Sequence, residues 1–415
     1  MSHVLVVNNC GFGHVMPTLD LVTELVRRGH RVTYASTGGP ARLVAATGAT
    51  VVEFDSALAG VDLAAVDTVD RSHQLLPLQV RESEAILRAV TAHFDTKPGG
   101  AELPDLPDVV AYDATVYHAG RILARKWAVP AVALCATLSS NEHFSLIDKI
   151  VETTGRKLPR AHPAMTEFAT RLLRLLAEHG QSDVSLEEFI GHAEGLHLEF
   201  YPRSFQYAGD TFDDRHVFVG PHLGDPNAPP TWTPPDDDKP LLVVSLGTSA
   251  NRRPEFFRTC AQALAELPWR ILMTVHEGVS DADLGPLPPN VEVHRWLPLR
   301  EVLAHADVFV CHGGMGSIMG ALAHATPVVV VPDSPEGMVN AARVTELGLG
   351  RALAEQTLTP QRLRGAVREV ATDPHIRDQV EAMRADIHDA GGGARGADAI
   401  EGFLKISHDR PGSGR

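Results

Sequence analysis

Short apolar runs alternate with longer amphipathic stretches through the first third of the chain. Residues 19–28 and 117–127 have the apolar spacing of helices that bury one face. The apolar runs that we interpret as strands are residues 3–8, 31–35, 50–54, 108–113 and 130–135. Near-continuous apolar strands are typical of parallel sheets covered on both faces. The alternation therefore predicts a doubly wound α/β domain.

Two longer stretches interrupt this alternation, at residues 56–100 and 137–192, and they are less regular. Each contains an apolar helical pattern, at 80–94 and at 168–176. Insertions after strands are where α/β folds place many ligand contacts. We expect these segments to supply contacts for a ligand, although the apolar pattern at 164–177 is equally compatible with ordinary core.

The composition changes between residues 201 and 240, where prolines accumulate and an acidic run occupies 236–238. We interpret 221–239 as a linker that follows a first domain at 1–220. Beyond it the pattern restarts, with a helix at 254–267 and a second domain at 240–393. The strands expected there are residues 241–246, 270–275, 291–294, 307–310 and 327–331.

Length and charge restrict the classes of protein to consider. At 415 residues the chain is too long for one core of ordinary size, and two large domains fit best. A formal net charge of −15 argues against nucleic acid or an anionic membrane as partner. The four cysteines have no CxxC spacing, and residues 1–7 lack the features of a signal or membrane segment. We expect reduced thiols and a cytoplasmic location.

The segment 311–317 reads Cys-His-Gly-Gly-Met-Gly-Ser and joins an apolar strand to a helical stretch. Glycines at Gly313, Gly314 and Gly316 let backbone N–H groups approach an anion closely. The following helix adds its positive N-terminal end, and Ser317 adds a hydroxyl donor. This arrangement predicts a cradle for a diphosphate.

Further residues extend this signature in a fixed order. They are Arg295-Trp296-Leu297-Pro298, His312, Ala325-Thr326-Pro327, the apolar run 328–331, Pro332, Glu336 and Asn340. The ordered set resembles the donor-binding signature of GT-B glycosyltransferases, in the branch that includes macrolide, glycopeptide and enediyne antibiotic glycosyltransferases. The resemblance implies two facing Rossmann-like domains with parallel sheets and an interdomain cleft. It also implies a C-terminal helix, 394–407, that packs back on the first domain, before a frayed tail at 408–415.

Several donor contacts follow from the resemblance. It implies that Trp296 stacks on the nucleobase with Leu297 beside it, and that His312 donates to a phosphate oxygen or to the departing nucleotide. Glu336 and Asn340 would bind the sugar or shape its pocket. A core or interface tryptophan is the alternative for Trp296, and a structural role is the alternative for His312.

The turn after the first strand of the second domain is a further candidate for the donor site. Ser245, Gly247 and Thr248 suit a tight turn under a phosphate, although a plain strand-to-helix turn explains them nearly as well. The acidic run 236–238 lies in the linker, where a solvated run of charges is the better interpretation than a metal site. We expect no metal and no cofactor.

The first domain opens with a second glycine motif, in which Gly11 and Gly13 follow the first strand. A dinucleotide fingerprint would place another glycine or alanine where Met16 stands, and Pro17 follows directly, so NAD binding is disfavoured. His14 matches the family histidine that removes the proton of the acceptor hydroxyl, and we place Gly13 in the donor site. Histidine suits this role because its pKa lies near neutrality.

A histidine base needs a carboxylate that fixes its tautomer. Asp113 ends a strand whose C-terminal edge opens onto the same crevice as the strand before His14, and it is our choice. Asp108 begins that strand and should lie at the opposite edge. A helix cap is the alternative role for Asp113.

Three positions depart from the family pattern. Gly320 replaces a glutamate that contacts the ribose, Gly337 replaces a glutamine that contacts the sugar, and Leu299 replaces a frequent glutamine. A site with fewer polar partners favours a dTDP-sugar over a UDP-sugar, and a deoxysugar over a fully hydroxylated one.

These observations predict a metal-independent inverting glycosyltransferase that moves a sugar from a dTDP-sugar, or else a UDP-sugar, to an apolar natural-product aglycone. A nucleotide-sugar epimerase of the same fold and a non-catalytic homologue that activates another enzyme are the alternatives. No nucleic acid or membrane partner is expected, and the sequence leaves a homodimer open.

Overall fold

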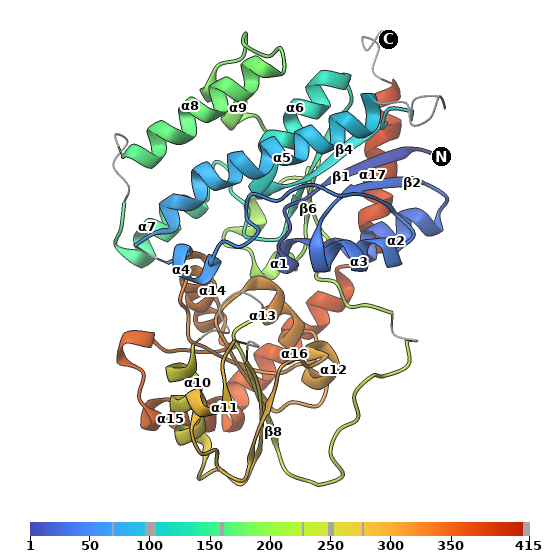
Figure 1. Ribbon diagram of the computed structural model, residues 1–415. Coiled ribbons are helices and arrows are strands. Elements are labelled where there is room, and N and C mark those ends of the chain that lie inside the picture. Colours follow the sequence, from blue (N-terminus) through green and yellow to red (C-terminus); the bar gives the residue numbers. More distant parts are fainter. Residues whose placement is uncertain are drawn as a thin grey trace.

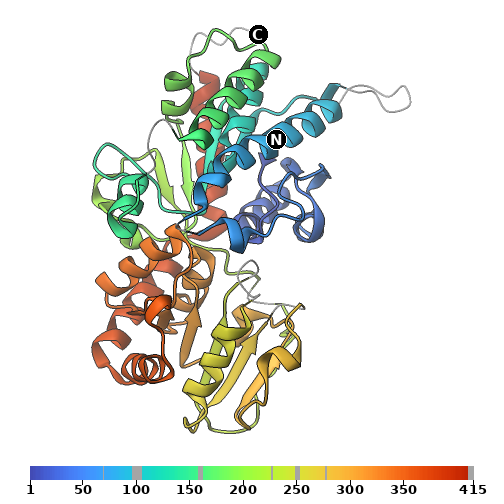
Figure 2. The ribbon, with the colours of Figure 1, turned by 60° about the vertical axis from the view of Figure 1, so that its left-hand side comes forward.

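The computed structural model describes residues 1–68, 70–95, 105–157, 162–225, 228–247, 253–275 and 278–409. Two predictions fall outside these ranges, namely Thr248 and most of the expected tail. Figures 1 and 2 show two α/β domains, one above the other, with the linker along one side.

The first sheet has seven strands in the order β3-β2-β1-β4-β5-β6-β7, and every described pairing is parallel. Its strands are β1 (His3–Val7), β2 (Arg31–Ala35), β3 (Thr50–Val52), β4 (Val109–Asp113), β5 (Ala131–Cys135), β6 (His197–Glu199) and β7 (His216–Phe218). The strand order reverses direction between β1 and β4. In open α/β sheets such a reversal leaves a crevice at the carboxyl ends of the strands.

Alternate residues of the strands supply two separate cores. In β1, Leu5 and Val7 face the core under α5 (Leu75–Asp95), α6 (Tyr117–Trp127) and α8 (Pro163–Glu178). Val4 and Val6 face the opposite core, under α2 (Leu19–Arg27) and α17 (Gly392–Asp409). Because side chains alternate across a strand, an unbroken apolar run is what a sheet covered on both faces requires. The predicted doubly wound sheet is confirmed.

The second sheet has six strands in the order β10-β9-β8-β11-β12-β13, again all parallel. They are β8 (Leu241–Ser245), β9 (Arg270–Thr274), β10 (Val291–His294), β11 (Val308–Cys311), β12 (Val328–Val330) and β13 (Gly350–Ala352). The helices of this domain are α10 (Pro254–Leu264), α11 (Asp281–Leu284), α12 (Leu299–Leu303), α13 (Met315–Leu322), α14 (Pro335–Glu346), α15 (Pro360–Thr372) and α16 (Pro374–Asp389). Its order reverses between β8 and β11, so this domain repeats the plan of the first.

The interruptions at 56–100 and 137–192 are more regular than we expected. They contain α4 (Leu63–Val66), α5, α7 (Leu146–Thr154), α8 and α9 (Leu186–Gly191). Three strands, β6, β7 and β13, were not predicted, because three residues are too few for a hydrophobic period to be recognised. The remaining short helices are α1 (Phe12–Val15) and α3 (Gly38–Ala46).

Contacts across the interface hold the two domains together. Arg343 of α14 donates hydrogen bonds to the carbonyl oxygens of Ser204, Phe205 and Gln206, at 2.9–3.0 Å. Chain segments also cross between the domains, because α17 follows the second domain in sequence and packs on α2 of the first. None of the helices within the described residues is both long and apolar enough to span a membrane.

Candidate donor and catalytic site

His14 and Asp113 meet at the reversal point of the first sheet. His14 lies in α1, directly after β1, and Asp113 is the last residue of β4. The Nδ1 atom of His14 donates to Asp113 Oδ2 at 2.8 Å. Asp113 is 1% exposed, whereas His14 is half-buried. Asp108 accepts from the backbone N–H of His3 at the opposite end of the strand.

Asp113 also has the capping role that we considered as its alternative. Its Oδ1 atom accepts the backbone N–H of Thr115 at 2.9 Å and contacts the Thr115 hydroxyl. Asn9 donates to Thr115 Oγ1 at 2.7 Å and lies 3.5 Å from Asp113 Oδ1. Burial alone would raise the pKa of Asp113, but His14 and Thr115 outweigh it and lower the pKa. The carboxylate is therefore held charged and in one orientation, as an orienting group requires.

The pKa of His14 responds to carboxylates from both domains. Burial would lower this pKa, but Asp113, Glu336 and Asp67 together raise it to about 9. Glu336 belongs to α14 of the second domain, and Asp67 follows α4 of the first. The electrostatic coupling places both carboxylates close to the imidazole. The two reversal points therefore face one another across the interdomain space.

His312 lies at the reversal point of the second sheet, between two glycines. A Cβ atom at Gly247 would stand 2.7 Å from His312 Cε1, and one at Gly314 would stand 2.8 Å from its Nε2. Gly247 also has a φ of +70°, and its N–H donates to Ser245 Oγ at 3.3 Å. These glycines make room for an imidazole ring, and the Ser245 hydroxyl holds the turn.

Gly313 and Gly337 pack against each other through their backbones. Gly313 has a φ of +95°, and a Cβ atom there would stand 2.8 Å from the carbonyl oxygen of Gly337. The fully buried Asn340 donates from Nδ2 to the Gly313 carbonyl oxygen at 2.9 Å, which ties α14 to this turn. Beside this turn, the buried atoms His312 Nδ1 and Asn340 Oδ1 have no hydrogen-bond partner among the described residues. Unpartnered buried polar atoms of this kind are expected beside a site that a polar ligand completes.

The N-terminus of α13 points its free N–H groups at the same turn. Gly314 is the N-cap residue and provides no side-chain cap. Gly316 and Ser317 lie in the first turn, and the Ser317 side chain has no hydrogen bond to any described residue. Uncapped N–H groups, the positive helix end and a free hydroxyl together suit an anion such as a diphosphate.

Trp296 and Leu297 point in different directions after β10. Trp296 is 72% exposed, so its indole is free to stack on a planar ligand. Leu297 is 8% exposed and belongs to the core of the second domain. The prediction that Leu297 contacts the donor stays a prediction, and such a contact would come from its backbone because its side chain packs in the core.

Sequence reasoning missed three charged residues near these turns, namely Arg253, Asp333 and Asp67. Arg253 Nη1 pairs with Asp333 Oδ2 at 3.0 Å, just before α14. Burial first, and then the charge of Asp333, raise the pKa of Asp67 to about 6. Burial likewise raises the pKa of Glu336 to about 7. Asp67 lies far from any motif in sequence, and only its position within the insertion at 56–100 hinted at a ligand contact.

The described residues contain one group whose donor atoms lie close enough together to suggest a metal. Cys135, His197 and Glu199 offer atoms within 4.8 Å of one another, on β5 and β6. Glu199 already bonds with His216 at 2.8 Å and accepts from the hydroxyl of Ser139 at 2.7 Å. The carboxylate is thus satisfied by hydrogen bonds within the first sheet.

Comparison with known proteins agrees with this architecture. Residues 258–392 match the family model of the erythromycin biosynthesis protein CIII-like C-terminal domain. The chain belongs to the family of GT-B glycosyltransferases that includes macrolide and other antibiotic glycosyltransferases, and it is itself a glycosyltransferase.

Three similar proteins span almost the whole chain. The demethyllactenocin mycarosyltransferase of Streptomyces fradiae is 38% identical over 97% of this chain and 87% of its own length. The oleandomycin glycosyltransferase of Streptomyces antibioticus is 34% identical over 99% of this chain and 92% of its own length. The crystal structure of the calicheamicin glycosyltransferase CalG4 has a TM-score of 0.82, with 42% identity over 98% of both chains.

Exchanging Trp296 for alanine tests the exposed indole. We expect the Kd for a nucleoside diphosphate to rise about 5- to 150-fold, since stacking on an aromatic side chain contributes about 1–3 kcal/mol per base. Calorimetric titration of the two proteins measures the change. Phenylalanine at this position is the matched control and should retain most of the affinity. An unchanged Kd in the alanine variant would exclude stacking.

Proposed function

We propose that this glycosyltransferase moves a deoxysugar from a dTDP-sugar to an apolar natural-product aglycone, with inversion at the anomeric carbon. In this proposal residues 240–393 hold the donor, residues 1–220 hold the acceptor, 221–239 link them, and 394–407 pack on the first domain. The observation that carries it is the His14–Asp113 contact, placed across the interdomain space from the glycine turn around His312.

The chemistry is a single displacement. His14 Nε2 takes the proton of the acceptor hydroxyl while Asp113 stabilises the resulting imidazolium through Nδ1. The acceptor oxygen forms a bond to the anomeric carbon as the bond from that carbon to the diphosphate oxygen breaks. An in-line displacement of this kind inverts the configuration.

Negative charge develops on the departing diphosphate. The N–H groups at the start of α13 would donate hydrogen bonds to the diphosphate oxygens on which that charge develops. The residues that would supply these contacts are Gly313, Gly314, Gly316 and Ser317. Fixed dipoles aimed at a developing charge lower the barrier without reorganisation. We propose on this ground that the transfer needs no metal ion and no cofactor.

The preference for dTDP rests on the space around Gly320. A Cβ atom there would meet only Leu303 Cδ1, at 3.9 Å, so packing does not force glycine at this position. Glycine at this position offers the ribose no polar partner and leaves the space beside it unfilled. A nucleotide lacking the 2′-hydroxyl leaves no such partner missing.

Parallel calorimetric titration with dTDP, UDP and NAD, without divalent metal, tests the proposal. We expect tight binding of dTDP, weaker binding of UDP and none of NAD. A preference for UDP would retain the transferase and discard the argument from Gly320. If no nucleotide bound, the non-catalytic alternative would replace the proposal.

The rate should depend on pH through His14. A base must be neutral to accept a proton, and the carboxylates around His14 raise its pKa to about 9. His14 is therefore mainly protonated at pH 7, and kcat/KM should rise with pH until about 9. A profile from pH 6 to 10, with an acceptor that does not titrate in this range, measures it. A flat profile would remove His14 as the base.

A further inference from the structure

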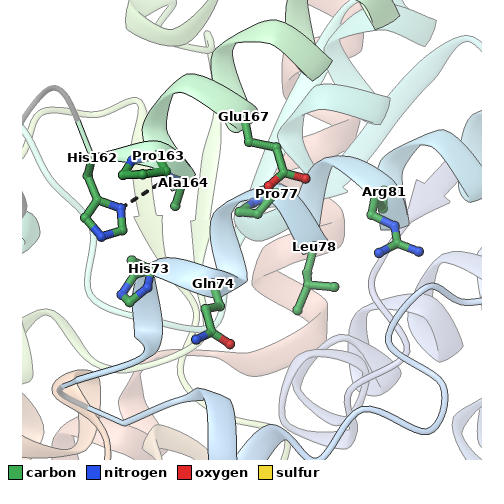
Figure 3. A pocket seen from close by; sticks show the side chains of 9 residues that line it. All are labelled: His73, Gln74, Pro77, Leu78, Arg81, His162, Pro163, Ala164 and Glu167. Carbon is green, nitrogen blue, oxygen red and sulfur yellow. Dashed lines mark hydrogen bonds between the residues drawn. The ribbon is translucent and has the colours of Figure 1, made fainter.

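An open hollow of about 400 Å³ lies between the first turns of α5 and α8 in the first domain. Figure 3 shows two imidazole rings, from His73 and His162, at one end and the Arg81 side chain at the other. Pro77 and Leu78 from α5 line the wall between them. None of these residues belongs to the turns that hold His14 or His312.

The two helices that form the hollow both begin beside it. α5 extends over 21 residues and α8 over 16, and the lining residues come from their first two turns and from the residues just before them. The N-terminal end of a helix carries a partial positive charge. Both helix dipoles therefore favour negative charge in the hollow.

The imidazole rings present N–H donors. His162 Nδ1 accepts the backbone N–H of Ala164 at 3.2 Å and so caps α8. An accepting Nδ1 places the proton of the neutral ring on Nε2, which becomes a donor. The rings of His73 and His162 lie edge to face, with centroids 4.5 Å apart. One bound oxygen-containing group is able to reach both.

Arg81 is a charged side chain of the hollow that has no ion-pair partner among the described residues. The only carboxylate in the lining, Glu167, pairs with Arg171 at 2.9 Å. Arg174 nearby pairs with Glu84 at 3.1 Å. No carboxylate among the described residues lies within ion-pair distance of Arg81, although the protein has a formal net charge of −15. An exposed arginine left unpaired in an acidic protein is available to an anionic ligand.

The remaining walls are apolar. Pro77 is buried and Leu78 half-buried, and Pro163 and Ala164 face them from α8. These side chains offer surface to a ring or an alkyl chain rather than to a free inorganic ion. The occupant should combine an apolar body with one anionic group.

The hollow lies within reach of the proposed catalytic centre. Asp67 acts on the pKa of His14, so it lies near that imidazole. His73 follows six residues later, and six residues span at most roughly 20 Å. Figure 1 shows α5 and α8 starting on the side of α7, and α4 lies between them and the second domain. A polycyclic or macrocyclic molecule is long enough to bridge the hollow and His14.

We propose that this hollow is an acceptor subsite that binds a carboxylate, or an equivalent anionic group, on an apolar ring-bearing aglycone. The inference rests on the proposed function and names the class of its acceptor. Arg81 pairs with the anionic group at its end of the hollow, His73 and His162 donate to a polar oxygen of the same molecule at the other end, and the proline and leucine side chains contact the ring system between them. The hydroxyl to be glycosylated then lies at the far end of the same molecule, towards His14.

A matched pair of coumarins tests the subsite without any donor. 7-Hydroxycoumarin-4-acetic acid and 7-hydroxy-4-methylcoumarin share the ring and the phenol, and only the first has a carboxylate. We expect the acid to bind the whole protein about tenfold more tightly, in a fluorescence titration at low ionic strength. The difference should shrink as salt is added, because Arg81 is exposed. Equal affinities, or no binding of the acid, would overturn the proposal.

Two variants separate the subsite from a general charge effect. In Arg81→Gln we expect the preference for the acid to disappear, with the affinity for the neutral coumarin unchanged. Arg88→Gln removes another exposed arginine of α5, outside the hollow, and should keep the preference. Loss of the preference in both variants, or in neither, contradicts the assignment. Binding of dTDP, measured on the same proteins, reports separately on the donor site and on folding.

Discussion

Replacing His14 with alanine is expected to lower kcat by about 10²- to 10⁴-fold, the range that a positioned general base contributes. The reason is the contact with Asp113 at 2.8 Å, which holds the imidazole in one tautomer at the reversal point of the first sheet. The measurement is initial-rate kinetics with a saturating donor and an acceptor alcohol. Affinity for dTDP should change little, because the proposed nucleotide contacts other than Gly13 come from the second domain.

The control for this prediction is an acceptor that needs no base. A thiol or an acidic phenol already ionised at the assay pH should lose far less rate in the alanine variant. If the alcohol and the ionised acceptor lose the same factor, then His14 acts by shaping the site. If neither loses rate, the base has been assigned to the wrong residue.

Asparagine in place of Asp113 is expected to lower kcat on the order of 10³-fold, since an amide can hold His14 in the wrong tautomer and cannot stabilise its cation. Asparagine caps helices about as well as aspartate, so the bond from the Thr115 N–H should survive. The substitution therefore separates catalysis from capping. Steady-state kinetics give the first effect, and thermal unfolding gives the second.

The pH profile provides a second readout for this variant. Asp113 contributes most among the carboxylates that raise the pKa of His14, so its neutralisation should move the rising limb of the kcat/KM profile to lower pH. A purely structural role would reduce the rate without moving the limb. A large loss of unfolding temperature together with an unmoved limb would assign Asp113 to capping alone.

Both proposed halves of the reaction lie at the reversal points of parallel sheets. In each domain the first strand and the fourth are neighbours in space, and both turns after them open at the same edge. His14 and Asp113 occupy one such pair of strand ends, and Ser245 and His312 occupy the other. Two copies of one plan, facing each other, place the proposed base and the proposed anion cradle on opposite sides of one space.

Much of this arrangement could be predicted from local patterns. The glycines at Gly313, Gly314 and Gly316 predict a tight turn before a helix, because few other structures require so many glycines. The structure adds a reason that sequence reasoning lacked. Gly314 and Gly247 leave room for the His312 ring, and Gly313 packs against the backbone of Gly337. The departure at Gly337 is therefore part of a close backbone contact as well as a loss of an amide.

Other parts could not be read from the pattern, because they depend on residues that meet only in space. Leu297 follows Trp296 directly, yet one side chain enters the core and the other faces solvent. Asp67 belongs to an insertion without a motif, and its effect on the pKa of His14 arises because folding brings the two residues near each other. The short strands β6 and β7 have too few residues to show a period and exist through their neighbours in the sheet.

The sequence by itself determined the two α/β domains and the glycine turn before α13, because periodicity and turn chemistry are local properties. The roles proposed for His14 and Asp113 came from resemblance to the family. The tertiary structure alone decided which carboxylates surround His14 and that the Trp296 side chain is exposed whereas that of Leu297 is buried. It also decided that Arg81, His73 and His162 line the same hollow. Those facts depend on how helices from distant parts of the chain pack against one sheet and on how two domains face each other, which no local pattern records.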